Sequence, residues 1–79
     1  MELSQHAKQV LRERSIDKTW VRKAIESPDR VETGEDGNTH YIKSIAEQGE
    51  RFLRVVVNTH VTPQRVVTAF FDRRLRRER

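Results

Sequence analysis

Three side chains of this sequence have the chemistry for proton transfer and phosphate binding: His6, Arg14 and Arg54. An imidazole exchanges protons near neutral pH, so His6 could act as a general acid or base. A guanidinium is a planar donor that fits a phosphate, which is the functional interpretation of Arg14 and Arg54. The alternatives are structural. His6 could be a partly buried histidine bonded to a backbone carbonyl, and Arg14 could interact with the negative end of a helix dipole.

Arg54 interrupts an apolar run, "RFLRVVVNT", which begins at residue 51. A charged side chain in a strand must face solvent or a groove, because an unpaired buried charge is costly. On an exposed sheet face Arg54 would lie beside residues of the adjacent strands such as Tyr41, Lys43 and Thr68. Together these side chains could hold a phosphodiester backbone. The alternative is a solvated face on which Arg54 pairs with an acidic residue across the strands.

The sequence lacks the patterns of metal and cofactor sites. It has no cysteine, and its histidines, His6, His40 and His60, do not have the spacing of helical metal ligands. Its three glycines fall in predicted turns and form no phosphate-binding or dinucleotide-binding motif. We therefore expect no metal and no cofactor.

Charge is distributed unevenly along the 79 residues. Residues 1–50 carry eight basic and ten acidic side chains, whereas residues 51–79 carry eight basic and two acidic ones. Many of these cations lie in "FFDRRLRRER", which includes Arg73 and Arg74. Such a positive surface favours phosphates or acidic proteins, and phosphate contacts would be sensitive to salt. The alternative is that the arginines only keep the protein soluble.

The sequence has no apolar run near the roughly 18 residues of a membrane span. Its first residues also lack the charged-then-apolar pattern of a secretory signal. We expect a cytoplasmic protein that makes no membrane contact.

Two helices are predicted before the first strand. Apolar side chains recur with helical spacing over residues 4–14, and Ser4 precedes them as an N-cap. Asp17 caps a second helix, which ends at "SPD" of residues 27–29. Four strands follow, over residues 30–33, 39–46, 51–59 and 65–71.

This order predicts an α+β fold in which two N-terminal helices pack on one face of a four-stranded, mostly antiparallel sheet. The whole chain, 1–79, is expected to form a single domain. Its helical part is 4–27, its sheet is 30–71 and its basic tail is 72–79.

The order of several short motifs resembles the bacterial domain of unknown function 4258 family. These motifs are "HA…ER.I…V..AI..PD.V", "G…Y.K", "LRVVV" and "VVTAFFDRR". The last strand and arginine tail are also similar to BrnT-type toxins of the RelE-like group of small ribonucleases. The resemblance implies a RelE-like fold whose sheet face binds RNA and, in the BrnT case, an antitoxin protein as partner.

Individual residues carry the resemblance. His6 matches the histidine of the opening motif, Arg14 the arginine at its end, and Arg54 the basic position in the strand before the last. Arg73 and Arg74 match the arginines that follow the last strand of BrnT-like chains.

The leading hypothesis is a small RNA-interacting protein that acts as a metal-independent endoribonuclease of toxin–antitoxin type. His6 would transfer protons, and Arg14 and Arg54 would stabilise the charge on the phosphorane. The substrate-binding residues would be Tyr41, Lys43, Arg73 and Arg74. This hypothesis requires the imidazole of His6 and the guanidinium of Arg54 to share one water-accessible hollow.

Two alternatives lack catalysis. In the first, the chain is an interaction module whose arginine-rich surface binds nucleic acid or an acidic partner protein. In the second, it keeps the family fold without an active site. Val10 favours the second, because the family often has an arginine at this position, four residues after the histidine.

Overall fold

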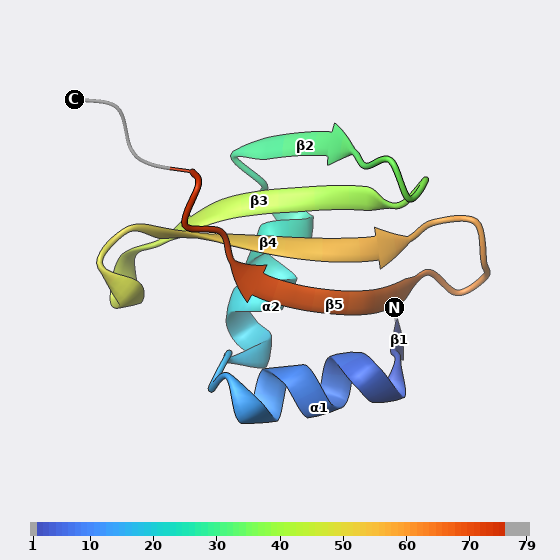
Figure 1. Ribbon diagram of the computed structural model, residues 1–79, viewed down its shortest axis with the longest axis horizontal. Coiled ribbons are helices and arrows are strands. Elements are labelled where there is room, and N and C mark those ends of the chain that lie inside the picture. Colours follow the sequence, from blue (N-terminus) through green and yellow to red (C-terminus); the bar gives the residue numbers. More distant parts are fainter. Residues whose placement is uncertain (1, 76–79) are drawn as a thin grey trace.

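The computed structural model describes residues 2–75 and shows an α+β fold, with two α-helices against one face of a sheet (Figure 1). In chain order the elements are β1 (Glu2–Leu3), α1 (Gln5–Glu13), α2 (Lys18–Glu26), β2 (Arg30–Thr33), β3 (Thr39–Ile45), η1 (Ala46–Gln48), β4 (Arg51–Asn58) and β5 (Arg65–Phe71). Residues 76–79 of the predicted basic tail, including Arg76, Arg77 and Arg79, lie outside the described residues.

Both predicted helix caps are confirmed. The Ser4 hydroxyl accepts the backbone N–H of Ala7 at 3.0 Å, and Asp17 Oδ1 accepts that of Thr19 at 2.8 Å. Each bond satisfies a backbone donor that the first helical turn would otherwise leave unpaired. Neither helix of the described chain is long and apolar enough to span a membrane.

Within residues 2–75 the sheet has five strands in the order β1-β5-β4-β3-β2, so the prediction of four strands was wrong. The additional strand is β1, which pairs with the start of β5 in parallel, whereas the other three pairings are antiparallel. With only two residues, β1 is too short to produce a recognisable alternation of apolar and polar side chains. It forms because the N-terminal residues lie against the edge of β5.

The core lies between the helices and the sheet. Leu53, Val55 and Val57 of β4 are completely buried and contact apolar side chains of both helices, including Ala7 and Ala24. This confirms the predicted alternation, which places Arg54 on the opposite face of the same strand. Figure 1 shows α2 crossing behind the sheet and α1 running beside β5, so neither helix of residues 2–75 covers the face that carries Arg54.

Side chains at the two ends of α1 also form hydrogen bonds with backbone carbonyl groups along the outer edge of β5. The Ser4 hydroxyl donates to the carbonyl of Val67 at 3.2 Å, and Arg14 Nη1 donates to the carbonyl of Ala69 at 3.1 Å. These bonds follow directly after the short pairing of β1 with β5. Unsatisfied carbonyl groups at a sheet edge are a template for pairing with another chain, and these two bonds occupy two of them.

Replacing Arg14 with glutamine is expected to lower the free energy of unfolding by about 1 kcal/mol, because the carbonyl of Ala69 loses its donor. Urea unfolding followed by circular dichroism measures the change. The same substitution at Arg12, which is exposed on the same helix, is the control and should change stability by less than about 0.5 kcal/mol. Equal losses would show that Arg14 does not stabilise the edge.

Candidate nucleic-acid interface

Arg54 lies at the centre of a charged network on the helix-free face of the sheet. Its Nε donates to Asp72 Oδ2 at 2.9 Å, and its Nη1 donates to Glu32 Oε1 at 3.2 Å. The same Nη1 lies 3.0 Å from Nδ1 of His40. Because a guanidinium can only donate, Nδ1 of His40 must be the acceptor. Arg54 is only 8% exposed, so these partners compensate a charge that has lost most of its contact with water.

The acidic members of this network are held in the ionised state. The pKa of Asp72 is far below its usual range, mainly because the Arg74 side chain donates to it, with further contributions from the backbone N–H of Arg74 and from Arg54. The pKa of Glu32 is also lowered, first by Arg30 and then by Arg54. The face therefore consists of compensated charges, and Arg54 is not a free cation.

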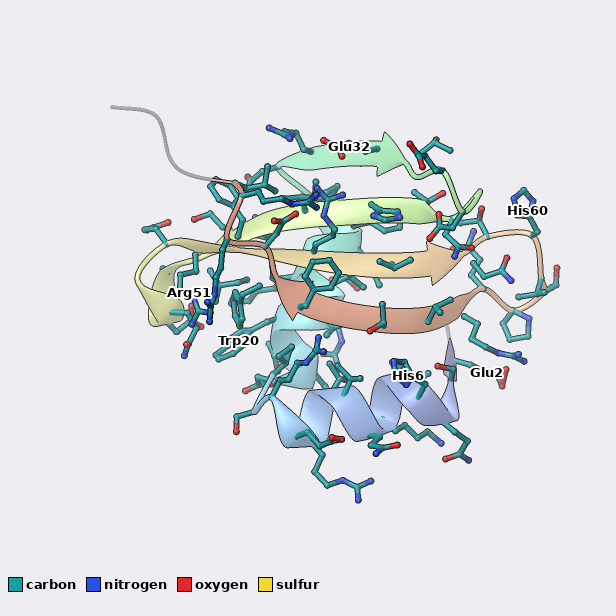
Figure 2. All side chains as sticks on the ribbon, viewed as in Figure 1. Glu2, His6, Trp20, Glu32, Arg51 and His60 are labelled. Atoms are coloured by element: carbon teal, nitrogen blue, oxygen red, sulfur yellow. The ribbon has the colours of Figure 1, made fainter. Side chains whose placement is uncertain are left out.

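His6 and Arg54 have different surroundings. His6 is exposed in the first turn of α1, on the side of the molecule where β1 and β5 lie (Figure 2). The partners of Arg54 belong to β2, to β3 and to the segment after β5, and no described partner belongs to α1. The hydrogen bonds of Arg54 therefore do not bring it to His6, and none of the hollows described for residues 2–75 is lined by both side chains.

Arg14 lies at the β5 edge and donates to a backbone carbonyl there. The three predicted catalytic residues thus occupy separate places: His6 at the start of α1, Arg14 at its end and Arg54 at the sheet centre.

Tyr41 and Lys43 do not lie on the face that carries Arg54, so the expected neighbourhood was wrong. Ile42 is the residue of β3 that pairs with Arg54, and residues directly opposite each other share a face. Tyr41 instead packs against the core on the helix side. The Lys43 ammonium group donates to the carbonyl of Ser27 at 2.9 Å, just after α2.

The register brings other residues to the Arg54 face. Phe70 of β5 pairs with Arg54, and His40 and Thr68 pair with Val56 on either side of β4. Of the residues named from the sequence as neighbours, only Thr68 lies on this face. The cross-strand pairing with an acidic residue, which was the structural alternative, is realised by Glu32 and Asp72.

Arg73 and Arg74 differ in their environment. Arg74 is bonded to Asp72 through its backbone N–H and its guanidinium, at 3.0 and 3.1 Å. Arg73 is exposed and has no hydrogen bond or ion pair within the described part of the chain. It lines a cleft of about 270 Å³ at the end of the sheet where β4 begins and β5 ends.

We call this hollow the arginine–aromatic cleft, and its lining residues are Arg51, Phe52, Phe71, Asp72, Arg73 and Leu75. The guanidinium carbon of Arg51 lies 4.4 Å from the centroid of the Phe71 ring, which is cation–π geometry. Trp20 of α2 contacts Phe71 edge-on, with ring centroids 6.2 Å apart. Figure 2 shows Arg51 and Trp20 close together at this end of the molecule. Sequence reasoning did not select Arg51, although a basic residue beside an aromatic one at a strand start was a visible signal.

Comparison with protein families places the sequence in a known group. The sequence model of the family described as Domain of unknown function (DUF4258) matches residues 3–71, which is most of the chain. The chain belongs to the DUF4258 family. The predicted family is thereby confirmed. No curated protein and no solved structure matched the chain.

The matched region of this DUF4258 chain includes Arg51, Arg54 and Phe71 but ends before Asp72 and Arg73. The cleft therefore combines residues of the family region with residues that follow it. The similarity to BrnT and other RelE-like toxins remains a prediction, because the match extends to the DUF4258 family alone.

Proposed function

We propose that this chain is a non-catalytic RNA-binding module and that single-stranded RNA binds in the arginine–aromatic cleft. The observation that carries the proposal is the Arg51 guanidinium stacked on Phe71 in the same hollow as Arg73. Proteins that bind single-stranded RNA stack the bases on aromatic rings or guanidinium planes and place cations beside the phosphates.

The charge of the cleft supports an anionic ligand. Among the lining residues that the structure describes, Asp72 is the one acidic residue; its side chain is only 2% exposed and is bonded to both Arg54 and Arg74. Arg51 and Arg73 are exposed, so their charges are available to solvent. A phosphate entering the cleft would meet cations, while the negative charge of Asp72 is already compensated.

RNA would be bound by the protein without being cleaved. Proton transfer and phosphate stabilisation would have to act on the same phosphodiester, whereas His6 and Arg54 lie apart. The RelE-like fold assignment, the antitoxin partner and the cytoplasmic location stay predictions that are compatible with RNA binding.

Fluorescence anisotropy with a labelled single-stranded RNA of about 12 nucleotides tests the proposal, with the matching RNA duplex for comparison. We expect Arg51→Gln to weaken binding of the single strand by about fivefold or more, because one phosphate contact and one stacking surface are lost. Arg65→Gln is the matched control, since Arg65 is an exposed arginine at the other end of β5 and the change in net charge is the same.

The control should lose less than about twofold. Equal losses from the two variants, or tighter binding of the duplex, would contradict a specific single-strand site in the cleft. Gel analysis of the same RNA tests cleavage. Intact RNA is the expected result, and cleavage that disappears in His6→Ala would restore the endoribonuclease hypothesis.

A further inference from the structure

The helices carry a second positive surface, away from the arginine–aromatic cleft. Two adjoining hollows of about 330 and 390 Å³ share Leu11 and Lys18 and together form what we call the helix groove. Its aliphatic lining residues are Leu3, Leu11, Ile16 and Val21, and its charged ones are Lys8, Arg12, Lys18, Arg22 and Glu26.

The cations of the helix groove are unpaired within residues 2–75. Lys8, Arg12, Lys18 and Arg22 are all exposed, and none of their side chains has a hydrogen bond or ion pair in the described chain. By contrast, Arg54 and Arg74 are bound to acidic partners.

The spacing of these cations is regular. Lys8 and Arg12 are four residues apart on α1, and Lys18 and Arg22 are four apart on α2. Each pair therefore lies on one face of its helix, and the two faces border the same groove. An acidic ligand with charges at helical spacing would be complementary to both rows.

The lining favours a protein over RNA as the acidic ligand. No residue that lines the helix groove is aromatic, so it offers no stacking surface for bases. Its floor is aliphatic, with Leu3 half-buried and Leu11, Ile16 and Val21 almost completely buried. Leu3 and the alkyl chains of the lysines and arginines are therefore the apolar surface that a leucine side chain would contact. Glu26 lies at one end of the groove and would repel a phosphate backbone, which carries a negative charge at every nucleotide. A peptide whose carboxylates are several residues apart can bind without placing one beside Glu26.

We propose that the helix groove binds an acidic amphipathic helix of a partner protein, whose carboxylates contact the lysines and arginines while its leucines contact the groove floor. This site is independent of the RNA site, because it uses α1 and α2 and none of the residues that line the arginine–aromatic cleft.

The probe is a labelled synthetic helix with glutamates four residues apart and leucines between them, and anisotropy measures its affinity for the full chain. A second peptide has glutamine in place of every glutamate, and a third has alanine in place of every leucine. Binding of the first peptide should be at least about fivefold tighter than that of either control peptide. Absence of binding, or equal binding of the three peptides, would overturn the proposal.

Matched protein variants locate the site. Lys8→Gln/Arg12→Gln removes two cations of the groove, and Lys23→Gln/Arg65→Gln removes two exposed cations elsewhere. Lys8→Gln/Arg12→Gln should weaken binding of the acidic peptide about fivefold or more, and Lys23→Gln/Arg65→Gln should weaken it less than about twofold. Equal losses would show that only net charge attracts the peptide and would overturn the proposal.

A cross-test separates this site from the RNA site. Arg51→Gln should leave peptide binding unchanged, and Lys8→Gln/Arg12→Gln should leave RNA binding within about twofold of the unmodified protein. Loss of peptide binding in Arg51→Gln would show that the peptide binds in the arginine–aromatic cleft and would overturn the assignment to the helix groove. Circular dichroism confirms that each variant is folded.

Discussion

Replacing Asp72 with alanine is expected to lower the free energy of unfolding by about 3 kcal/mol, which is a large part of the stability of so small a domain. The physical reason is the guanidinium that remains. Arg54 would stay buried after losing its 2.9 Å bond to Asp72, with only the half-buried Glu32 left to compensate its charge. Urea unfolding at neutral pH measures the loss.

Two control variants separate this effect from the removal of any acidic group. Arg74 also binds Asp72 but its side chain is 81% exposed, so Arg74→Ala should cost less than about 1 kcal/mol. In the double variant Arg54→Met/Asp72→Ala no buried charge is left unpaired, and most of the stability should return. A double variant as unstable as Asp72→Ala alone would contradict this account of the network.

Acid is expected to destabilise the protein through the same carboxylate. The pKa of Asp72 is lowered on folding, mainly by Arg74 and also by Arg54, whereas the unfolded chain should titrate near the ordinary value of 3.8. Ionised Asp72 therefore stabilises the fold fully above that pH. Its contribution decreases as the pH falls below about 4, because the unfolded chain then takes up the proton more readily.

The expected loss between pH 7 and about pH 2.5 is about 2 kcal/mol, measured as the difference in unfolding free energy between the unmodified protein and Arg54→Met/Asp72→Ala. The double variant retains Asp36 and the pairing of Glu32 with Arg30, so these contributions to the pH dependence cancel in the comparison. The smaller part of the Glu32 pKa shift that Arg54 causes is lost with Arg54 and is included in the measured difference. A difference that stays constant over this pH range would show that Asp72 does not titrate differently in the folded and unfolded states.

Local signals in the sequence predicted the helices well. Ser4 and Asp17 act on backbone groups two or three residues away, so their capping role depends on short-range geometry alone. The alternation of Leu53, Val55 and Val57 is similarly local, and it identified the buried face of β4.

Long-range features could not be predicted in the same way. Tyr41 and Lys43 were assigned to the Arg54 face because the register of β3 against β4 was unknown, and a shift of one residue moves every side chain to the other face. Asp72, the partner of Arg54, is 18 residues away along the chain, and Glu32 is 22 away. Only the order of the strands brings these three charges together.

The arginine–aromatic cleft depends on a similar convergence. Arg51 begins β4, Phe71 ends β5, and Arg73 follows in the next turn, so the antiparallel pairing of β4 with β5 places them together. The tail arginines were noticed in the sequence for their charge, but the aromatic surface beside them required the fold.

An NMR titration of the isotope-labelled protein with single-stranded RNA tests the central claim most directly. If the cleft is the RNA site, the largest amide shifts will be at residues 51–52 and 71–75, which include its lining residues. The amides of α1 that border the helix groove should change little. Shifts that are largest on α1 and α2, or no shifts at all, would contradict RNA binding in the arginine–aromatic cleft.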